Sequence, residues 1–444
     1  MSDAKSHPGA GEDNMNTRLG RLLRFLATAL LCGAGIAHAT NGLLFIGTGS
    51  ESEQMAGADV AVARDACAVS TNPAGLTQIA HRSLELYAST ARALDVVHQD
   101  QYGNDVSVSK KYIPTANAAF AERLGDSGWV AGIGLFVQGG AGDVYKNVST
   151  AFGTRDDMSS LFGILSLTAG AGYQINEAIS VGASIEGLYA KTTQRFFPVT
   201  SAFNSANPSA SFFGYDLGEI SGVNAGVRLG AMWRPAEDLT FGAAFSNRVT
   251  LPQKNGNMDI DMNAVGLGTV HYSNARIDGL ALPLEAALGA SYRPASRWLL
   301  AFKWSWLNWS DALKSSTLIA TGPSNPLAPR SLSNTASLDW QNQNVFAIGA
   351  ERVLDERIVV RGGLNYGKNP IPPQTLNPLL AAIGETHLTF GFSRKFAQTW
   401  SFDSGIEYLF TKKVSYTNPQ LPFGENAQER DGYVALSIGL SRSW

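Results

Sequence analysis

The chain has 444 residues, of which 44% are hydrophobic, 10% aromatic and only 16% charged, and it contains 46 glycines. The formal net charge of −3 offers no basic surface, so nucleic acid is not an expected partner. Few charges, many glycines and many aromatic residues without a long apolar run exclude a bundle of transmembrane helices and favour a β-protein with two different faces.

The amino-terminal segment has the pattern of a secretory signal. Three arginines precede an apolar run at residues 25–36, and Ala37-His38-Ala39 matches a small-residue cleavage site. The run is too short to span a bilayer as a helix. We therefore expect residues 1–39 to comprise an upstream extension and a signal peptide that is cleaved before Thr40.

Residues 40–80 precede the first strand-like run and are rich in small residues and short apolar clusters. The stretch 50–65 has the composition of one or two short helices, and Asn72-Pro73 reads as a turn. Because the apolar residues 43–46 need burial, a folded segment is favoured over a disordered tail.

From residue 81 onward the chain alternates apolar and polar residues with the period of two that is typical of strands. We count about 14 such segments, an even number that suits a closed antiparallel barrel, and assign residues 81–444 to it. The expected strands span residues 82–98, 112–124, 129–138, 161–174, 179–191, 221–234, 239–250, 282–293, 297–309, 343–353, 356–367, 386–396, 399–411 and 432–444.

Short and long connections alternate along the whole series. The long ones are expected at 139–160, 192–220, 251–281, 310–342, 368–385 and 412–431. A transmembrane barrel has tight periplasmic turns at one end and external loops at the other, whereas a soluble sandwich has no reason for this alternation.

Aromatic residues gather beside the short turns, as an interfacial girdle requires. The alternative is ordinary core aromatics in a soluble barrel, but core residues would not cluster at turns. Trp129, Trp298 and Trp400 begin strands, Tyr173, Trp233 and Tyr292 end them, and Trp304, Trp306 and Trp309 are expected to approach the opposite rim.

The polar faces of the expected strands carry charged residues that would be costly toward lipid and must point into the lumen. Either they pair with one another, or Arg228, Lys303 and Arg361 meet the acidic head group of a ligand. A lumen of this width needs a plug, a ligand or water. We therefore expect residues 40–80 to form a hatch inside the barrel. The charged residues are Glu186, Arg228, Glu285, Lys303, Arg361, Asp403 and Glu407.

Several motifs in this order resemble one family. "MAGADVAVARDACAVSTNPAGL" closes on Asn72, Pro73 and Ala74, and the hairpins "YQINEAISVGASIEGLYA", "LPLEAALGASYRP" and "THLTFGFSRKFAQTWSFDSGIEYLF" follow. Together they resemble the FadL/TodX-type long-chain fatty-acid and hydrocarbon transporters of Gram-negative outer membranes. The final strand, "YVALSIGLSRSW", ends in an aromatic residue, as bacterial outer-membrane barrels do.

The resemblance implies a passive outer-membrane transporter for long-chain fatty acids or apolar and aromatic hydrocarbons. It implies a 14-stranded barrel gated by the hatch residues Asn72, Pro73 and Ala74. The ligand would leave sideways at an inward kink of the third strand. Gly139 and Gly140 either permit that kink or simply begin the external loop. Lateral exit keeps about 0.8 kcal/mol per buried CH₂ that an aqueous pore would forfeit.

Two other functions stay open. An outer-membrane lipid hydrolase would need a nucleophile beside a histidine, but His81, His98, His271 and His387 lie in no serine elbow and no metal-binding spacing. A general porin would have no use for a hatch. We expect no enzymatic activity, no cofactor and no metal. The expected partners are a hydrophobic small molecule and outer-membrane lipid, and because a barrel closes its own edges we expect a monomer.

Overall fold

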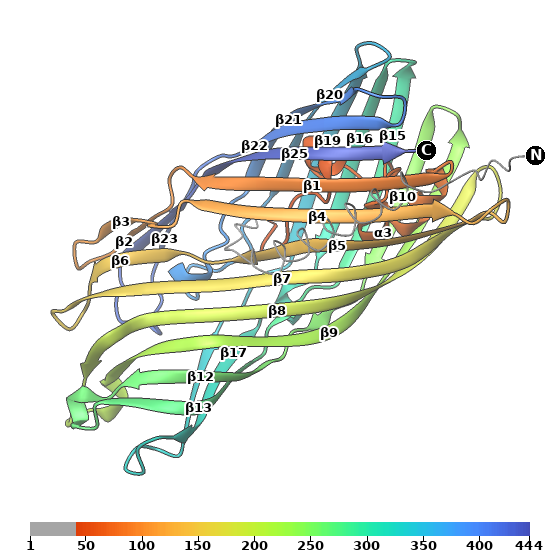
Figure 1. Ribbon diagram of the computed structural model, residues 1–444. Helices are drawn as coiled ribbons and strands as arrows, with labels where there is room; N and C mark the ends of the chain where they lie inside the picture. Colours follow the sequence, from red (N-terminus) through yellow and green to blue (C-terminus); the bar gives the residue numbers. More distant parts are fainter. Residues whose placement is uncertain (1–40) are drawn as a thin grey trace, which may run out of the picture.

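Figure 1 shows the computed structural model, which describes residues 41–444. The predicted signal peptide and its cleavage before Thr40 lie outside the described residues. The wall is a closed antiparallel barrel of fourteen strands, in which each strand pairs with its sequence neighbours and the last pairs with the first. The predicted fold class is therefore confirmed.

Several of the fourteen wall strands are interrupted and carry two labels. In chain order they are β1 (Arg82–Ala93); β4 (Tyr112–Arg123); β5 (Trp129–Ala141) with β6 (Val144–Ser149); β7 (Arg155–Gln174); β8 (Ile179–Ala202); β9 (Phe212–Ala236); β10 (Leu239–Ser246) with β12 (Gln253–Asp261); β13 (Thr269–Asp278) with β15 (Glu285–Ala295); β16 (Trp298–Leu307) with β17 (Ser315–Pro323); β18 (Ser331–Ser337) with β19 (Gln343–Val353); β20 (Ile358–Gly367); β21 (Thr386–Lys395); β22 (Trp400–Leu409) with β23 (Lys412–Tyr416); and β24 (Ala427–Asp431) with β25 (Tyr433–Ser443).

The remaining elements lie at the loop ends or inside the wall. β2 (Val97–Gln99) and β3 (Asp105–Ser107) join β23 and β24 in a four-stranded external sheet, and β11 (Val249–Thr250) pairs with β14 (Ala281–Leu282). The helices are short: α2 (Ser50–Gln54), α3 (Ala68–Thr71), η1 (Pro73–Gln78), η2 (Pro208–Ala210), η3 (Asn263–Val265), α4 (Trp309–Ala312) and η4 (Pro378–Leu380). No helix within residues 41–444 is both long and apolar enough to cross a membrane.

The expected strands match at the end of the barrel with short turns, here called the turn end. At the opposite end, the loop end, the strands continue beyond the prediction. β8 has 24 residues and β9 has 25, so much of the expected connection 192–220 is strand. In Figure 1, β7, β8 and β9 continue to the loop end beside β6, β12 and β13. The alternation of apolar and polar residues weakens in these extensions, which removes the signal that identified the strands nearer the turn end.

The barrel's outer face carries apolar side chains on alternate residues. On β9, Val223, Val227, Leu229 and Trp233 are all exposed. Aromatic residues meet beside the short turns, where the rings of Trp129 and Tyr173 lie 4.7 Å apart. This belt has the form that a lipid-facing surface requires.

One predicted rim residue lies elsewhere. Trp309 was expected to approach the rim at the loop end, but it is fully buried in the lumen, with its ring 5.2 Å from that of Trp340. The prediction was wrong because the strand ends at Leu307 and the chain turns inward through α4.

Residues 41–80 lie inside the ring of strands and are largely buried. The short helix α2 contacts β20, β21 and β22, and η1 contacts β7, β8 and β9 on the other side of the lumen. The described part of the expected hatch is thus packed between facing walls. The domain boundary at residue 80 stays a prediction.

Candidate transport site

The side chain of Asn72 forms hydrogen bonds both within the hatch and to the wall. Its side chain is fully buried; Nδ2 donates to Val60 O at 2.8 Å and to Ala231 O at 3.3 Å, and Oδ1 accepts from Ala74 N at 3.2 Å. The last bond caps η1, and Pro73 occupies the first turn of that helix, where a missing N–H costs nothing. One side chain therefore joins the hatch to itself and to β9.

The wall facing this turn is made of glycine. Gly172, Gly182 and Gly230 are direct cross-strand neighbours on β7, β8 and β9. A Cβ at Gly182 would lie 2.4 Å from the carbonyl carbon of Pro73, and one at Gly230 would lie 2.1 Å from Asn72 Oδ1. The hatch backbone can approach the wall this closely only because these side chains are absent.

An ion-pair network holds the opposite side of the hatch. Arg361 on β20 lies 2.8 Å from Glu351 Oε2 through Nε and 3.5 Å from Glu51 Oε2 through Nη2. Arg64 of the hatch contacts both carboxylates as well, at 2.7 Å from Glu51. Arg361 therefore binds the hatch, and its cationic head is occupied by carboxylates.

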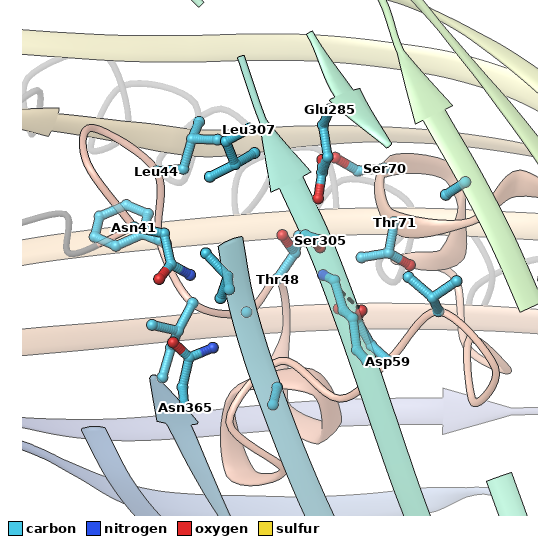
Figure 2. A pocket seen from close by; sticks show the side chains of 18 of the residues that line it. Asn41, Leu44, Thr48, Asp59, Ser70, Thr71, Glu285, Ser305, Leu307 and Asn365 are labelled. Carbon is cyan, nitrogen blue, oxygen red and sulfur yellow. Dashed lines mark hydrogen bonds and ion pairs between the residues drawn. The ribbon is translucent and has the colours of Figure 1, made fainter. Parts of the chain in front are cut away.

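A cavity of about 80 Å³ lies between the hatch and the wall. Figure 2 shows that both the hatch, with Leu44 and Asp59, and the wall strands, with Glu285 and Ser305, line it. Arg228 and Lys303 also line it. Two of the three predicted lumen cations are thus at the cavity, and the third, Arg361, is not among its lining residues.

The cations around this cavity form ion pairs with carboxylates, which outnumber them by one. Arg228 lies 3.1 Å from Glu186 Oε1 and 3.2 Å from Glu285 Oε2. Lys303 Nζ lies 3.1 Å from Asp59 Oδ1. Three carboxylates therefore surround two cations, and both cations are already bound.

An apolar cluster fills the lumen between the cavity and the loop end. Leu43 of the hatch joins Trp309, Trp340, Leu376 and Ile383, all nearly or fully buried. The sequence analysis missed the last four because it treated 310–342 and 368–385 as external loops or, for Trp309, as rim. The sequence offered no clear signal, because these connections are no richer in large apolar residues than the chain as a whole.

The pairing of the third wall strand changes near Gly139 and Gly140, where the sequence analysis placed a candidate kink. β5 pairs with β4 only from Val130 to Leu135, and beyond that point its register with β7 shifts between Val137 and Gly139. Gly139 and Gly140 have φ of 157° and 153°, and both lie within β5 rather than in the loop that follows it.

Beyond Leu135 the hatch, rather than β4, lies along this edge of β5. Gly140 N donates to Leu43 O at 3.0 Å, and Leu44 forms a bridge with Gly139. A Cβ at Gly139 would lie 1.8 Å from Leu43 O, so the contact needs glycine. On the β4 side, only the side chain of Asn117 reaches across, accepting from Val137 N at 2.8 Å.

The histidines give no support to a hydrolase. His98 binds Glu429 and Asp100, His271 binds Asp259, and His387 binds Glu407. Within residues 41–444 no imidazole hydrogen-bonds a serine or cysteine side chain, and no cluster of His, Cys, Asp and Glu is suited to a metal ion.

Comparisons with known proteins agree with this architecture. The family described as outer membrane protein transport protein (OMPP1/FadL/TodX) matches residues 32–441. Outer membrane protein P1 of Haemophilus influenzae is 22% identical, covering 88% of this chain and 90% of that protein.

Two solved structures share the fold. The toluene transporter TodX of P. putida has a TM-score of 0.74, and the toluene transporter TbuX of Ralstonia pickettii has a TM-score of 0.71. Each is 18% identical to this chain, and each comparison covers 90% of this chain and 99% of the other.

Proposed function

The chain belongs to the outer membrane transport protein family of OMPP1, FadL and TodX, an outer-membrane β-barrel family, and we propose that this member admits uncharged hydrophobic molecules such as aromatic hydrocarbons. The turn end then faces the periplasm and the loop end faces the outside. The relatives TodX and TbuX are toluene transporters, which is compatible with this substrate class.

The ion pairs of Arg228 and Lys303 support the choice of an uncharged substrate. A long-chain fatty acid brings a carboxylate that needs a free cation or hydrogen-bond donors. At the cavity, Arg228 and Lys303 are bound by three carboxylates, so an added anion meets an excess of negative charge. An uncharged ligand meets no such penalty and gains from the apolar cluster around Leu43 and Trp309.

The hatch tip, residues 43–45, and the loop-end half of β5, residues 136–141, which we take to bend inward, supply the route in this proposal. A ligand that has crossed the apolar cluster reaches the cavity beside Leu44. Release requires the hatch tip to leave Gly139 and Gly140, which opens the unpaired stretch between β4 and β5 toward lipid. Asn72, Pro73 and Ala74 hold the other end of the hatch and act as its anchor while the tip moves.

The test compares two substrates in cells that lack their own transporter. Wild type should take up a labelled alkylbenzene far better than a labelled long-chain fatty acid. Glu285→Gln removes one carboxylate from Arg228 and should raise fatty-acid uptake. Even in bulk water, the attraction between a freed cation and a carboxylate 4 Å away is about 1 kcal/mol, which corresponds to a change of about fivefold in fatty-acid uptake.

The matched control is Glu237→Gln, which removes an exposed carboxylate from the turn between β9 and β10. It should leave both uptakes unchanged. Fatty-acid uptake equal to alkylbenzene uptake in wild type would contradict the choice of an uncharged substrate.

Transport is favoured over the two alternatives. A hydrolase lacks a nucleophile beside any imidazole among residues 41–444. An open porin is difficult to reconcile with a lumen occupied by the hatch and by the cluster around Trp309. We accordingly propose that the protein is not an enzyme.

A further inference from the structure

The wall has a second interruption, between β9 and the strand formed by β10 and β12. The ladder between them ends where Asn247 N donates to Val227 O at 3.3 Å. It resumes only where Ser221 pairs with Lys254. Residues 222–226 of β9 pair with β8 on one side but have no backbone partner on the other.

The interruption exists because the neighbouring strands bend into the lumen together. After β10 the chain forms β11, which leaves the wall ladder and pairs with β14 instead. Val249 of β11 and Leu282 of β14 are buried in the same apolar cluster as Leu43. A Cβ at Gly226 would lie 2.7 Å from Val249 Cγ2, so the bent segment passes close to the inner face of β9.

Side chains, rather than backbone, close this interruption. Val227 N donates to Asn247 Oδ1 at 2.7 Å, and Ala225 N donates to Asn224 Oδ1 at 2.8 Å. Asn224 Nδ2 crosses to Thr250 O at 2.7 Å and to its Oγ1 at 2.9 Å. The gap beside β5 uses the same device, since Asn117 Oδ1 accepts from Val137 N. A side chain can swing away from such a bond without breaking a ladder.

The interruption lies at the depth of the lipid. Val223 is 74% exposed on the outer face, ten residues from Trp233 at the turn end. Ten residues of a strand tilted by about 40° rise by roughly 25 Å, the height of the apolar band. Backbone without ladder partners is tolerated at this depth only where it is buried in protein or lines a water-filled cavity.

A small cavity does lie behind it. Its volume is about 30 Å³, and Gly226, Val227 and Asn247 line it at the wall. Leu44 and Arg228 line this cavity and the central one alike. By the alternation along β9, Asn224 lies on the same, lumen-facing side as Gly226 and Arg228. Asn224 is nevertheless exposed, which indicates that little protein covers the wall at this point.

We propose that residues 222–226 and 247–252 frame a second lateral port, through which an uncharged hydrophobic ligand exchanges between the cavity and the outer half of the bilayer. This inference rests on the proposed function. The hatch tip at Leu44 stands between the two ports and borders both cavities. Opening needs only that Asn224 and Asn247 release their bonds.

Reversible cross-linking tests the port. Asn224→Cys with Thr250→Cys, closed by a short bis-methanethiosulfonate reagent, should lower alkylbenzene uptake at least fivefold, and a reductant should restore it. Ser404→Cys with Ile438→Cys is the control, because these residues are direct partners on the regularly paired β22 and β25. Closing that pair should change nothing.

A second cross-link distinguishes a failure of the second port from a failure of the proposed function. If Asn117→Cys with Val137→Cys blocks uptake and the Asn224–Thr250 link does not, the second port is refuted while transport stands. If no variant and no wild-type protein takes up alkylbenzene, the proposed function fails, and hydrogen exchange then decides the port.

Amide hydrogen exchange tests the port without any ligand. The amides of Ala225 and Val227 should exchange at least tenfold faster than those of Leu229 and Ala231, which face the same neighbour within the ladder. Asn247→Ala should accelerate Val227 further. Equal exchange at all four amides would overturn the port whatever the uptake result.

Discussion

The hydrogen bonds of Asn72 make it the residue whose loss should unseat the hatch. Asn72→Ala removes the cap of η1 and leaves Val60 O, Ala231 O and Ala74 N without this partner in a fully buried place. A lost cap costs about 1 kcal/mol and each unmet buried group about 1–3 kcal/mol, of which relaxation recovers a part. We expect roughly 2–4 kcal/mol, a factor of about 30 to 900 in the population of the unseated hatch.

Hydrogen exchange of residues 60–78 measures that population directly. The amides of this segment should exchange faster in Asn72→Ala, while the thermal unfolding of the barrel stays unchanged because the wall ladders do not involve this side chain. Asn72→Asp keeps the cap acceptor but loses both Nδ2 bonds, and should behave similarly. Thr71→Ala is the control, since the hydroxyl of Thr71 makes no hydrogen bond to any described residue. Identical exchange in Asn72→Ala and Thr71→Ala would refute the reasoning.

Two further predictions concern the hatch tip and the external sheet. Gly139→Ala places a Cβ 1.8 Å from Leu43 O at a φ unfavourable to alanine, so it should displace the tip and raise the steady conductance in planar bilayers; Gly163→Ala, whose Cβ would meet nothing within 4 Å, should not. In the external sheet, burial alone would lower the pKa of His98, but the adjoining carboxylates of Glu429 and Asp100 outweigh it and raise the pKa to about 9. Because this folded-state pKa exceeds the ordinary value of about 6.5, the stabilisation, on the order of 3 kcal/mol, is complete below that pH and is lost as the pH rises through 9. Amide exchange in β2, corrected for its intrinsic pH dependence, should therefore accelerate above pH 9 in wild type and show no such step in His98→Gln.

The wall could be predicted from the sequence because lipid on one side and a lumen on the other impose a strict period of two. Val223, Val227 and Trp233 carry that signal on β9, and the structure places them on the outer face. Beyond the lipid the constraint disappears, which is why the extensions of β8 and β9 were taken for connections. The inward turn at Trp309 was missed for a related reason, because a short apolar run does not tell which way its aromatic residues point.

The ion-pair partners of the lumen cations could not be predicted from the sequence. Lys303 was correctly placed on a lumen-facing strand, but its partner Asp59 lies 244 positions away in the hatch. Without that pairing, Lys303 looks like a cation available to a ligand. The partners of Arg228 on β8 and β15 are hidden in the same way, because strand register is set by contacts distant in sequence.

Tethering the hatch tip tests the central claim most directly. Phe45 N donates to Gln138 O at 3.4 Å, so Phe45→Cys with Gln138→Cys can be joined by a short reductant-cleavable reagent. The measurement is the uptake of a labelled alkylbenzene before linking, after linking and after reduction. Gated transport of uncharged hydrophobic molecules predicts uptake that falls on linking and returns on reduction. Uptake that continues unchanged with the tip tethered would contradict it.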